Sequence, residues 1–141
     1  MNFCFFGTLR DDDVLAAVLG RTVLRRPRHA AWLAGYRCVT FRGATFPALV
    51  AHADGKVPGL LVRGLTRLDA AVLDRFEGAA YRRRQLSVEL ADGKREGAFV
   101  YLLRRSSSAS EVDWDLEHWR KHHKQAFLDA VQHMKRHGAA G

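Results

Sequence analysis

The sequence is poor in cysteine, with only Cys4 and Cys38 among 141 residues. A disulfide scaffold needs more cysteines, and a zinc site needs them in closely spaced pairs. Both classes are therefore excluded. We expect the two residues to be buried thiols in a protein of the reducing cytoplasm.

Long apolar runs are also missing, since none reaches the roughly 18 residues that a membrane-spanning helix needs. The first strand-like run, residues 2–6, has no basic segment before it, and Arg10 and three aspartates follow soon after. We therefore expect neither a signal peptide nor an association with membranes.

Acidic residues are fewer than basic ones, 15 against 23, and the net charge is +8. Such a charge raises the question of nucleic-acid binding, but the arginines are scattered from Arg10 to Arg136. No helix-turn-helix, zinc-finger or RNA-reading signature accompanies them. We therefore predict a solvated basic surface and no nucleic-acid partner.

The apolar pattern predicts one domain of the α+β class. Short strands are expected at residues 2–6, 30–41, 46–50, 57–62, 81–90 and 98–103. The dipeptides Asp54-Gly55 and Asp92-Gly93 are typical of tight hairpin turns. Because strands and helices do not alternate regularly, we predict a small mixed, mainly antiparallel β-barrel with flanking helices.

Two helices carry recognisable start and stop signals. Residues 11–13 are aspartates, which favour a helix N-terminus, and Gly20 follows the helix as a stop; the aspartates alone are a poor metal site. Thr66 and Asp69 have the spacing of a capping box. Residues 68, 72, 73 and 76 are expected to form the buried face of that second helix, which ends at Gly78.

The C-terminal region is expected to add a linker and a helix to the barrel domain. Residues 1–105 are expected to form the barrel domain, and Ser106–Ser110 a short linker. One helix is expected from about Trp114 to His137, with an apolar face that packs on the same domain, and residues 138–141 are expected to fray.

The segment Gly7-Thr8-Leu9 follows the first strand and is a candidate anion-binding turn. Glycine allows the backbone to turn sharply, so successive N–H groups can converge on a carboxylate. A plain strand-to-helix turn explains the same residues. Thr8 is read as a turn hydroxyl rather than a nucleophile, since no base is adjacent.

Glu77 is the candidate acid or base. It ends the second helix beside Phe76, a position that draws its carboxylate toward the core, where proton transfer at neutral pH becomes feasible. A solvated glutamate, or one paired with Arg75 or with an arginine at 82–84, is the alternative.

Histidines cluster late in the chain. His118 and His122, like His133 and His137, have the four-residue spacing that places both rings on one helix face. No H-E-x-x-H motif or cysteine pair supports a metal centre, so solvated helix positions are preferred and no metal is expected.

Five short motifs occur in order between residues 3 and 103. They are FFGTLR at 5–10, LAGYR at 33–37, FPALV at 46–50, VPGLL at 57–61, and LDRFEG with the following YRR at 73–83. In this order they resemble the gamma-glutamylcyclotransferase-like family, specifically its gamma-glutamylamine cyclotransferase branch.

The resemblance implies a cofactor-independent enzyme that releases 5-oxoproline and a free amine from a small gamma-glutamyl compound. It implies that Glu77 is the catalytic acid/base. The substrate-binding residues that it implies are Phe6, Gly7, Thr8, Leu9, Tyr81 and Arg83.

One position departs from the family pattern, because Phe6 stands where the family has tyrosine. The alternative is therefore a catalytically inactive module of the same fold that only binds small molecules. The C-terminal helix, outside the strongest match, is expected to cover the pocket or to form a homodimer interface.

Overall fold

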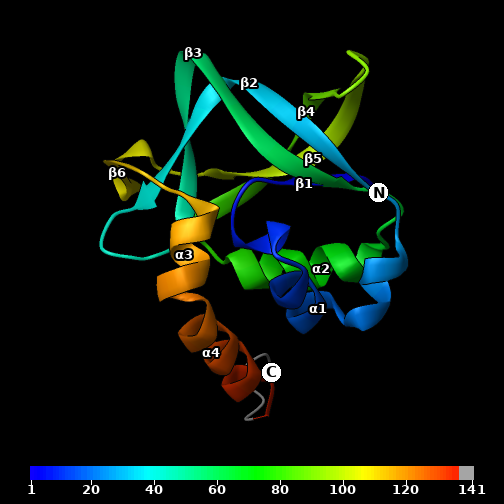
Figure 1. The fold of residues 1–141 in the computed structure, drawn as a ribbon, viewed down its shortest axis with the longest axis vertical. Helices are drawn as coiled ribbons and strands as arrows, with labels where there is room; N and C mark the ends of the chain where they lie inside the picture. The colour runs from blue at the N-terminus through cyan, green and yellow to red at the C-terminus, as the bar shows by residue number, and fades with distance from the viewer. Residues whose placement is uncertain (137–141) are drawn as a thin grey trace.

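The computed structural model describes residues 1–136 and consists of six strands with helices gathered on one side (Figure 1). The strands are β1 (Phe3–Phe5), β2 (Arg28–Phe41), β3 (Pro47–Val62), β4 (Tyr81–Leu90), β5 (Arg95–Leu103) and β6 (Ala109–Asp113). The α-helices are α1 (Asp12–Leu19), α2 (Arg67–Glu77), α3 (Leu116–His122) and α4 (Lys124–Arg136). Three short 3₁₀ helices complete the described chain: η1 (Thr8–Arg10), η2 (Arg21–Arg25) and η3 (Ser106–Ser108).

The sheet closes into a barrel. Its strand order is β3-β1-β5-β4-β2-β6, and β3 also pairs with β2, so five strands form a ring that β6 extends at one edge. The pairing of β1 with β5 is parallel, and the other pairings in the described chain are antiparallel. The predicted mixed, mainly antiparallel barrel with flanking helices is confirmed.

Asp54-Gly55 is not the predicted hairpin turn. β3 runs through this dipeptide, and the turn that joins β2 to β3 lies at residues 42–46. The ladder is irregular here, since Ala34 pairs with Lys56 but Tyr36 pairs with Ala51. A Cβ on Gly55 would lie 2.0 Å from the Tyr36 carbonyl oxygen, so this glycine permits a close backbone approach rather than a turn.

Asp92-Gly93 does form the predicted hairpin between β4 and β5. Gly93 has φ of +84° and its N–H donates to the Leu90 carbonyl at 3.0 Å. The strand after it begins at Arg95, three residues earlier than the pattern predicted.

The helix ends follow the predicted signals. The Asp11 carboxylate caps α1 by accepting from the N–H groups of Asp13 and Val14, and the capping box of Thr66 and Asp69 opens α2. The predicted face of α2 is partly wrong, because Leu68 is 75% exposed while Ala70 and Leu73 are buried. The buried positions of α2 follow the i, i+3 spacing from residue 70, and this places residue 68 outside the packed stripe.

Residues 106–113 are structured rather than a linker. They form η3 and β6, which pairs with β2 through Phe41–Ala109 and Val39–Asp113. The predicted single C-terminal helix is two helices, α3 and α4, broken at His123. The predicted fraying of 138–141 lies outside the described residues.

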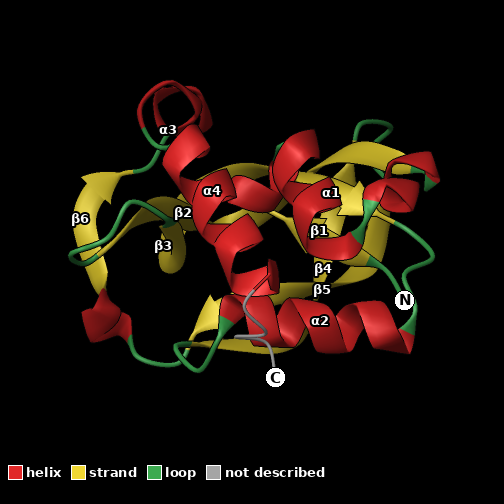
Figure 2. Cartoon of the chain, turned by 90° about the horizontal axis from the view of Figure 1, so that it is seen from below, coloured by secondary structure: helices red, strands yellow, loops and turns green. Residues whose placement is uncertain are grey.

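Two large apolar clusters, with a third and smaller one around Val39, hold the described residues together. One lies between the barrel and the helices and includes Phe3, Leu73 and Trp119; the other fills the barrel and includes Phe6 and Val88. Viewed from below, the helices lie in front of the sheet, and α4 runs from α3 toward α2 (Figure 2). Cys4 is buried as predicted and Cys38 is only partly buried, and both are free thiols.

Candidate active site

A cavity of about 380 Å³ lies between the end of β1, the start of β3 and the helices. Its walls come from residues 4–9 and 46–49, from α1, α2 and α4, and from single residues of β2, β4 and β5. Of the seven site residues predicted from sequence, six line it, namely Phe6, Gly7, Thr8, Leu9, Glu77 and Tyr81.

The Gly7 turn contributes backbone to the cavity wall. Gly7 is the N-cap of η1 and no side chain caps this helix, so its first N–H groups have no partner from within the helix or from a cap. A Cβ on Gly7 would lie 2.4 Å from Cγ of Pro47, another lining residue. Glycine is therefore required by the close packing of this turn against the start of β3.

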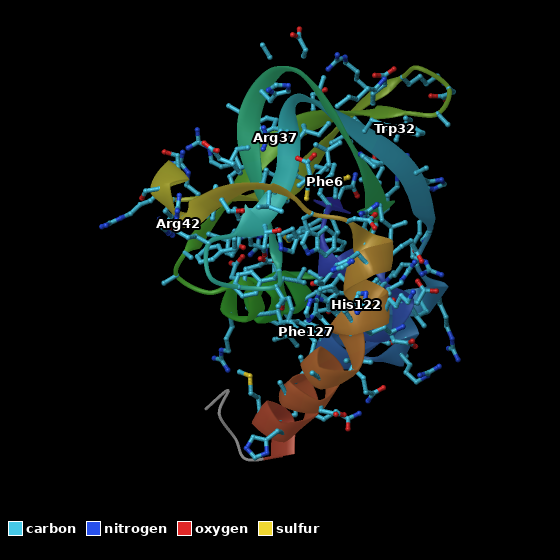
Figure 3. All side chains as sticks on the ribbon, turned by 60° about the vertical axis from the view of Figure 1, so that its left-hand side comes forward. Phe6, Trp32, Arg37, Arg42, His122 and Phe127 are labelled. Carbon is cyan, nitrogen blue, oxygen red and sulfur yellow. The ribbon has the colours of Figure 1, made fainter. Side chains whose placement is uncertain are left out.

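Phe6 directs its ring into the barrel. The side chain is 5% exposed and belongs to the barrel cluster, where it lies so close to Gly59 that a Cβ there would be 2.6 Å from the ring (Figure 3). The carbonyl of Phe6 accepts a weak hydrogen bond from the Cys38 thiol at 3.8 Å. Its ring therefore supports the turn from inside the barrel.

Glu77 is the last residue of α2, and Gly78 ends the helix with φ of +81°. The side chain is half-buried and lines the cavity, with no hydrogen bond or ion pair to any of residues 1–136. Burial, and secondarily the carboxylate of Asp74, raise the pKa of Glu77 to about 8. The negative end of the helix dipole acts in the same direction. This carboxyl group is therefore able to exchange protons near neutral pH.

Tyr81 contacts Pro47 beside the Gly7 turn and lies near Glu77. Its hydroxyl donates to the Pro47 carbonyl at 2.7 Å, which holds the start of β3 against Gly7. Burial and the nearby Glu77 raise the pKa of Tyr81, so its hydroxyl remains protonated over the range in which Glu77 titrates.

Arg83 is placed differently from the other six residues, because it does not line the cavity. Its Nε lies 3.4 Å from Oδ1 of Asp74, and its guanidinium lies over the ring of Phe99 at 4.9 Å and that of Phe3 at 5.7 Å. The alternation of β4 does put Arg83 on the face that packs toward α2, but Asp74 and these aromatic rings occupy the space beside it.

Asp74 and Tyr101 were not singled out from the sequence. The Tyr101 hydroxyl donates to Oδ1 of Asp74 at 2.6 Å, and Tyr101 lines the cavity. Asp74 lies one turn before Glu77 on α2, a relation that the helix spacing of the LDRFEG motif contains. The cavity-lining residues of α4 had only an apolar helical pattern as their signal.

The remaining sequence candidates lie apart from this cavity. The rings of His118 and His122 are 4.4 Å apart on α3, but residues 1–136 contain no group of three ligands suited to a metal ion. The pair His133 and His137 cannot be compared, since His137 lies outside the described residues. No helix within residues 1–136 is long and apolar enough to span a membrane.

Comparison with known proteins agrees with this architecture. The sequence profile described as "Gamma-glutamyl cyclotransferase, AIG2-like" matches residues 3–121. AIG2-like protein C of Arabidopsis thaliana is 28% identical over 130 residues, which cover 90% of this chain and 73% of that protein. AIG2-like protein D of the same plant is 30% identical over 128 residues, which cover 87% of this chain and 81% of that protein.

Solved structures show the same fold. A solution structure of an Arabidopsis thaliana protein aligns with a TM-score of 0.67 at 24% identity, over 98% of this chain and 83% of that chain. A structure described as gamma-glutamyl cyclotransferase aligns with a TM-score of 0.53 at 17% identity, over 74% of this chain and 68% of that chain. By its profile, its motifs and its barrel, this chain belongs to the gamma-glutamyl cyclotransferase, AIG2-like family.

Proposed function

We propose that this protein is a cofactor-independent gamma-glutamyl cyclotransferase that releases 5-oxoproline and a free amine from a gamma-glutamyl amine or a related gamma-glutamyl compound. The observation that carries the proposal is Glu77, an unpaired carboxyl group with a raised pKa in a cavity beside the Gly7 turn. Family membership supports the same class of reaction.

The reaction is an intramolecular aminolysis. The substrate's α-amine attacks its own side-chain amide carbonyl, a five-membered lactam forms, and the amide C–N bond breaks to expel the amine. Because the attacking and attacked groups are tethered, holding the substrate in its folded conformer supplies much of the rate advantage. The protein's remaining task is the movement of protons.

Glu77 is suited to move these protons. The pKa of about 8 brings Glu77 closer in acidity to the α-ammonium group of the substrate than an ordinary glutamate, with a pKa of about 4.3, would be. Each unit by which the two pKa values approach each other lowers the energetic cost of the proton transfer by about 1.4 kcal/mol. Glu77 takes the proton from the ammonium group and returns it to the departing nitrogen, so no net proton is consumed.

The Gly7 turn is suited to hold the negative groups of the reaction. Backbone N–H groups at the start of η1 line the same cavity as Glu77 and are not capped by a side chain. Such groups stabilise the α-carboxylate or the oxyanion of the tetrahedral intermediate, because they are fixed before the charge develops. This turn would bind the substrate through its backbone, so the missing hydroxyl of Phe6 does not remove the interaction.

The test is Glu77→Gln, with Glu89→Gln as the matched control, since Glu89 pairs with Lys56 at 3.2 Å away from the cavity. We expect Glu77→Gln to lower 5-oxoproline release at least roughly 100-fold, and the control to retain it. A raised pKa means that folded Glu77 destabilises the protein increasingly as pH rises from about 4.5 to 8. Glu77→Gln should therefore be at least as stable as the parent protein at pH 8.

The alternative function gives a different result. If the parent protein binds gamma-glutamyl compounds in calorimetry but cyclises none of them, it is a binding module and the enzymatic proposal is wrong. Full turnover by Glu77→Gln would instead remove this residue from the mechanism.

A further inference from the structure

The cavity is wider than the chemistry of a glutamyl group requires. Its volume of about 380 Å³ lies within the range of pockets that enclose drug-sized ligands. Glu77, Tyr81, Tyr101 and the Gly7 turn supply polar groups beside the proposed reaction, and Arg75 and Lys135 also line the cavity. The rest of the cavity must face the part of the substrate that leaves as the amine.

That remaining wall is apolar and comes from three helices. We name it the amine-side wall, and its residues are Val18 of α1, Val72 of α2, and Phe127, Ala130, Val131 and Met134 of α4. The α4 residues 127, 131 and 134 recur at helical spacing and so share one face. Val72 and Met134 remain 38% and 52% exposed, which places apolar side chains at the rim of the cavity.

The amine-side wall is fixed to the core beside the acid. The ring of Phe127 meets that of Phe76, the neighbour of Glu77 in sequence, edge to face at 5.9 Å. On its other side Phe127 packs at 5.4 Å against the buried ring of Trp119 (Figure 3 labels Phe127). At the start of α4, Lys124 binds Asp11 at 3.0 Å and Asp13 at 2.8 Å. These contacts hold α4 in position next to Glu77.

The charges of the cavity indicate which amines fit. Within residues 1–136, Glu77 is the single acidic residue that lines it, and the basic residues that line it are Arg75 and Lys135. An amine with a second ammonium group would meet an apolar wall and two cations, and burying an unpaired charge is strongly unfavourable. An apolar or aromatic body would instead gain from leaving water.

We propose that the amine-side wall is the subsite for the leaving amine, and that it selects gamma-glutamyl compounds whose amine carries a bulky apolar or aromatic body. This inference rests on the proposed function. It goes beyond it by assigning α4 to substrate selection and by naming the chemical class of the leaving group.

The test compares gamma-glutamyl phenethylamide with gamma-glutamyl methylamide, which share the reacting atoms and differ in the apolar body. We expect kcat/KM for the phenethylamide to be roughly 10 to 100 times higher, as expected for burying one aromatic side chain. The isopeptide of gamma-glutamate with the lysine ε-amine should be no better than the methylamide. Gamma-glutamyl phenylalanine carries the same phenyl group as the phenethylamide and adds a carboxylate to the leaving amine. Its rate relative to the phenethylamide shows whether the subsite takes an amino acid or a simple amine.

Variants of α4 connect the preference to this wall. Val131→Asp should reduce the ratio of phenethylamide to methylamide rates toward one, while Ala126→Asp, at an exposed position that does not line the cavity, should leave it unchanged. Met134→Gln at the rim is a milder second variant, expected to lower the ratio several-fold without loss of the fold. The methylamide rate should be unchanged in Ala126→Asp, whereas Val131→Asp and Met134→Gln are judged by the ratio of the two rates.

The outcomes separate this inference from the proposed function. If the methylamide is cyclised in a Glu77-dependent manner but the phenethylamide is no better, or if Val131→Asp and Met134→Gln both leave the ratio unchanged, the amine-side assignment is wrong and the enzyme remains. If no gamma-glutamyl compound is cyclised, the proposed function fails and this inference fails with it.

Discussion

The carboxyl group of Glu77 differs from those of Asp11 and Asp74 because it forms no ion pair within residues 1–136. Asp11 accepts a hydrogen bond from Nε of Arg120, and its carboxylate lies 3.0 Å from Nζ of Lys124. The carboxylate of Asp74 lies 3.4 Å from Nε of Arg83. Glu77 instead ends a helix in a cavity and faces the like charge of Asp74. Each of these surroundings disfavours the charged form, and together they place its titration in the pH range where an amine can exchange protons with it.

Asp74→Asn is predicted to shift the pH dependence of the reaction. The substitution removes the like charge that contributes to the raised pKa of Glu77. The rising limb of kcat/KM against pH should therefore move to lower pH, on the order of half a unit to one unit. The measurement is kcat/KM for one gamma-glutamyl substrate between pH 5.5 and 9.5.

Tyr101→Phe is the control for this shift. It removes the hydroxyl that donates to Asp74 at 2.6 Å but leaves the carboxylate in place. The limb should then stay where it is or move to higher pH, since Asp74 loses a hydrogen bond that delocalises its charge. A midpoint that Asp74→Asn leaves unmoved, or raises, would show that Asp74 does not tune Glu77.

Among the residues expected in the site, Glu77 lies in the cavity wall and Arg83 does not, while the roles of both residues remain predictions. Glu77 was predictable because the LDRFEG motif and the glycine stop put it at a helix end. The family resemblance implied that Arg83 binds substrate, but Arg83 does not line the cavity. The neighbours that occupy its guanidinium, Asp74, Phe3 and Phe99, come from three other elements and have no signal in the motif.

At the scale of elements, a single buried carboxylate joins α1 to α3 and α4. Asp11 is 2% exposed, caps α1, accepts from Nε of Arg120 at 2.8 Å and lies 3.0 Å from Nζ of Lys124. Burial acts to raise the pKa of Asp11, but the hydrogen bonds from these two cations and from the Val14 N–H outweigh it and lower the pKa overall.

Asp11→Ala is therefore predicted to destabilise the fold by roughly 2 kcal/mol, because it removes a helix cap and a buried anion that accepts charged hydrogen bonds. The two cations keep their other partners, since Arg120 still pairs with Glu117 and Lys124 with Asp13. The measurement is the free energy of unfolding in urea at pH 7. The contribution of Asp11 is fully present above its unfolded pKa of about 4 and declines as pH falls through its lower folded value.

Asp12→Ala is the matched comparison, since Asp12 also lies in the first turn of α1 but forms an exposed ion pair with Arg28. Its loss should change stability by less than about 1 kcal/mol. Equal effects of the two substitutions would contradict the role assigned to the Asp11 contacts.

The two Asp-Gly dipeptides, both predicted to form hairpin turns, adopt different structures. Asp92-Gly93 turns the chain because Gly93 adopts positive φ, whereas Gly55 has no positive φ and permits the approach of the Tyr36 carbonyl. Aspartate-glycine suits both situations, since each needs a residue without a side chain. Only the pairing of β2 with β3 along their whole length distinguishes a turn from an irregularity within a strand.

At the scale of the whole molecule, the arginines that form ion pairs are spread over several elements. The arginines that form ion pairs with carboxylates within residues 1–136 are Arg28, Arg37, Arg63, Arg83 and Arg120. They lie on β2, β4 and α3 and, for Arg63, just after β3, rather than along one element. This spread fits the expected solvated basic surface, and the absence of a nucleic-acid partner stays a prediction.

We predict that the protein does not bind oligonucleotides at physiological salt. Retention on single- or double-stranded DNA should be weak, and the logarithm of any measured affinity should change little with the logarithm of salt concentration. A steep slope, corresponding to several released counterions, would contradict this prediction. The cytoplasmic location and the homodimer likewise remain predictions.

The family, the barrel class and the helix caps could be predicted from the amino-acid sequence, because each depends on local patterns of a few neighbouring residues. The same patterns pointed to Glu77, whose catalytic role remains a proposal. Only the tertiary structure decided that α4 forms a wall of the cavity, that Arg83 lies outside it, and that Asp74 and Tyr101 surround the acid. These arrangements depend on contacts between residues far apart in the chain, such as Asp11 and Arg120, 109 positions apart. Such contacts are selected by the packing of whole elements, which no local pattern encodes.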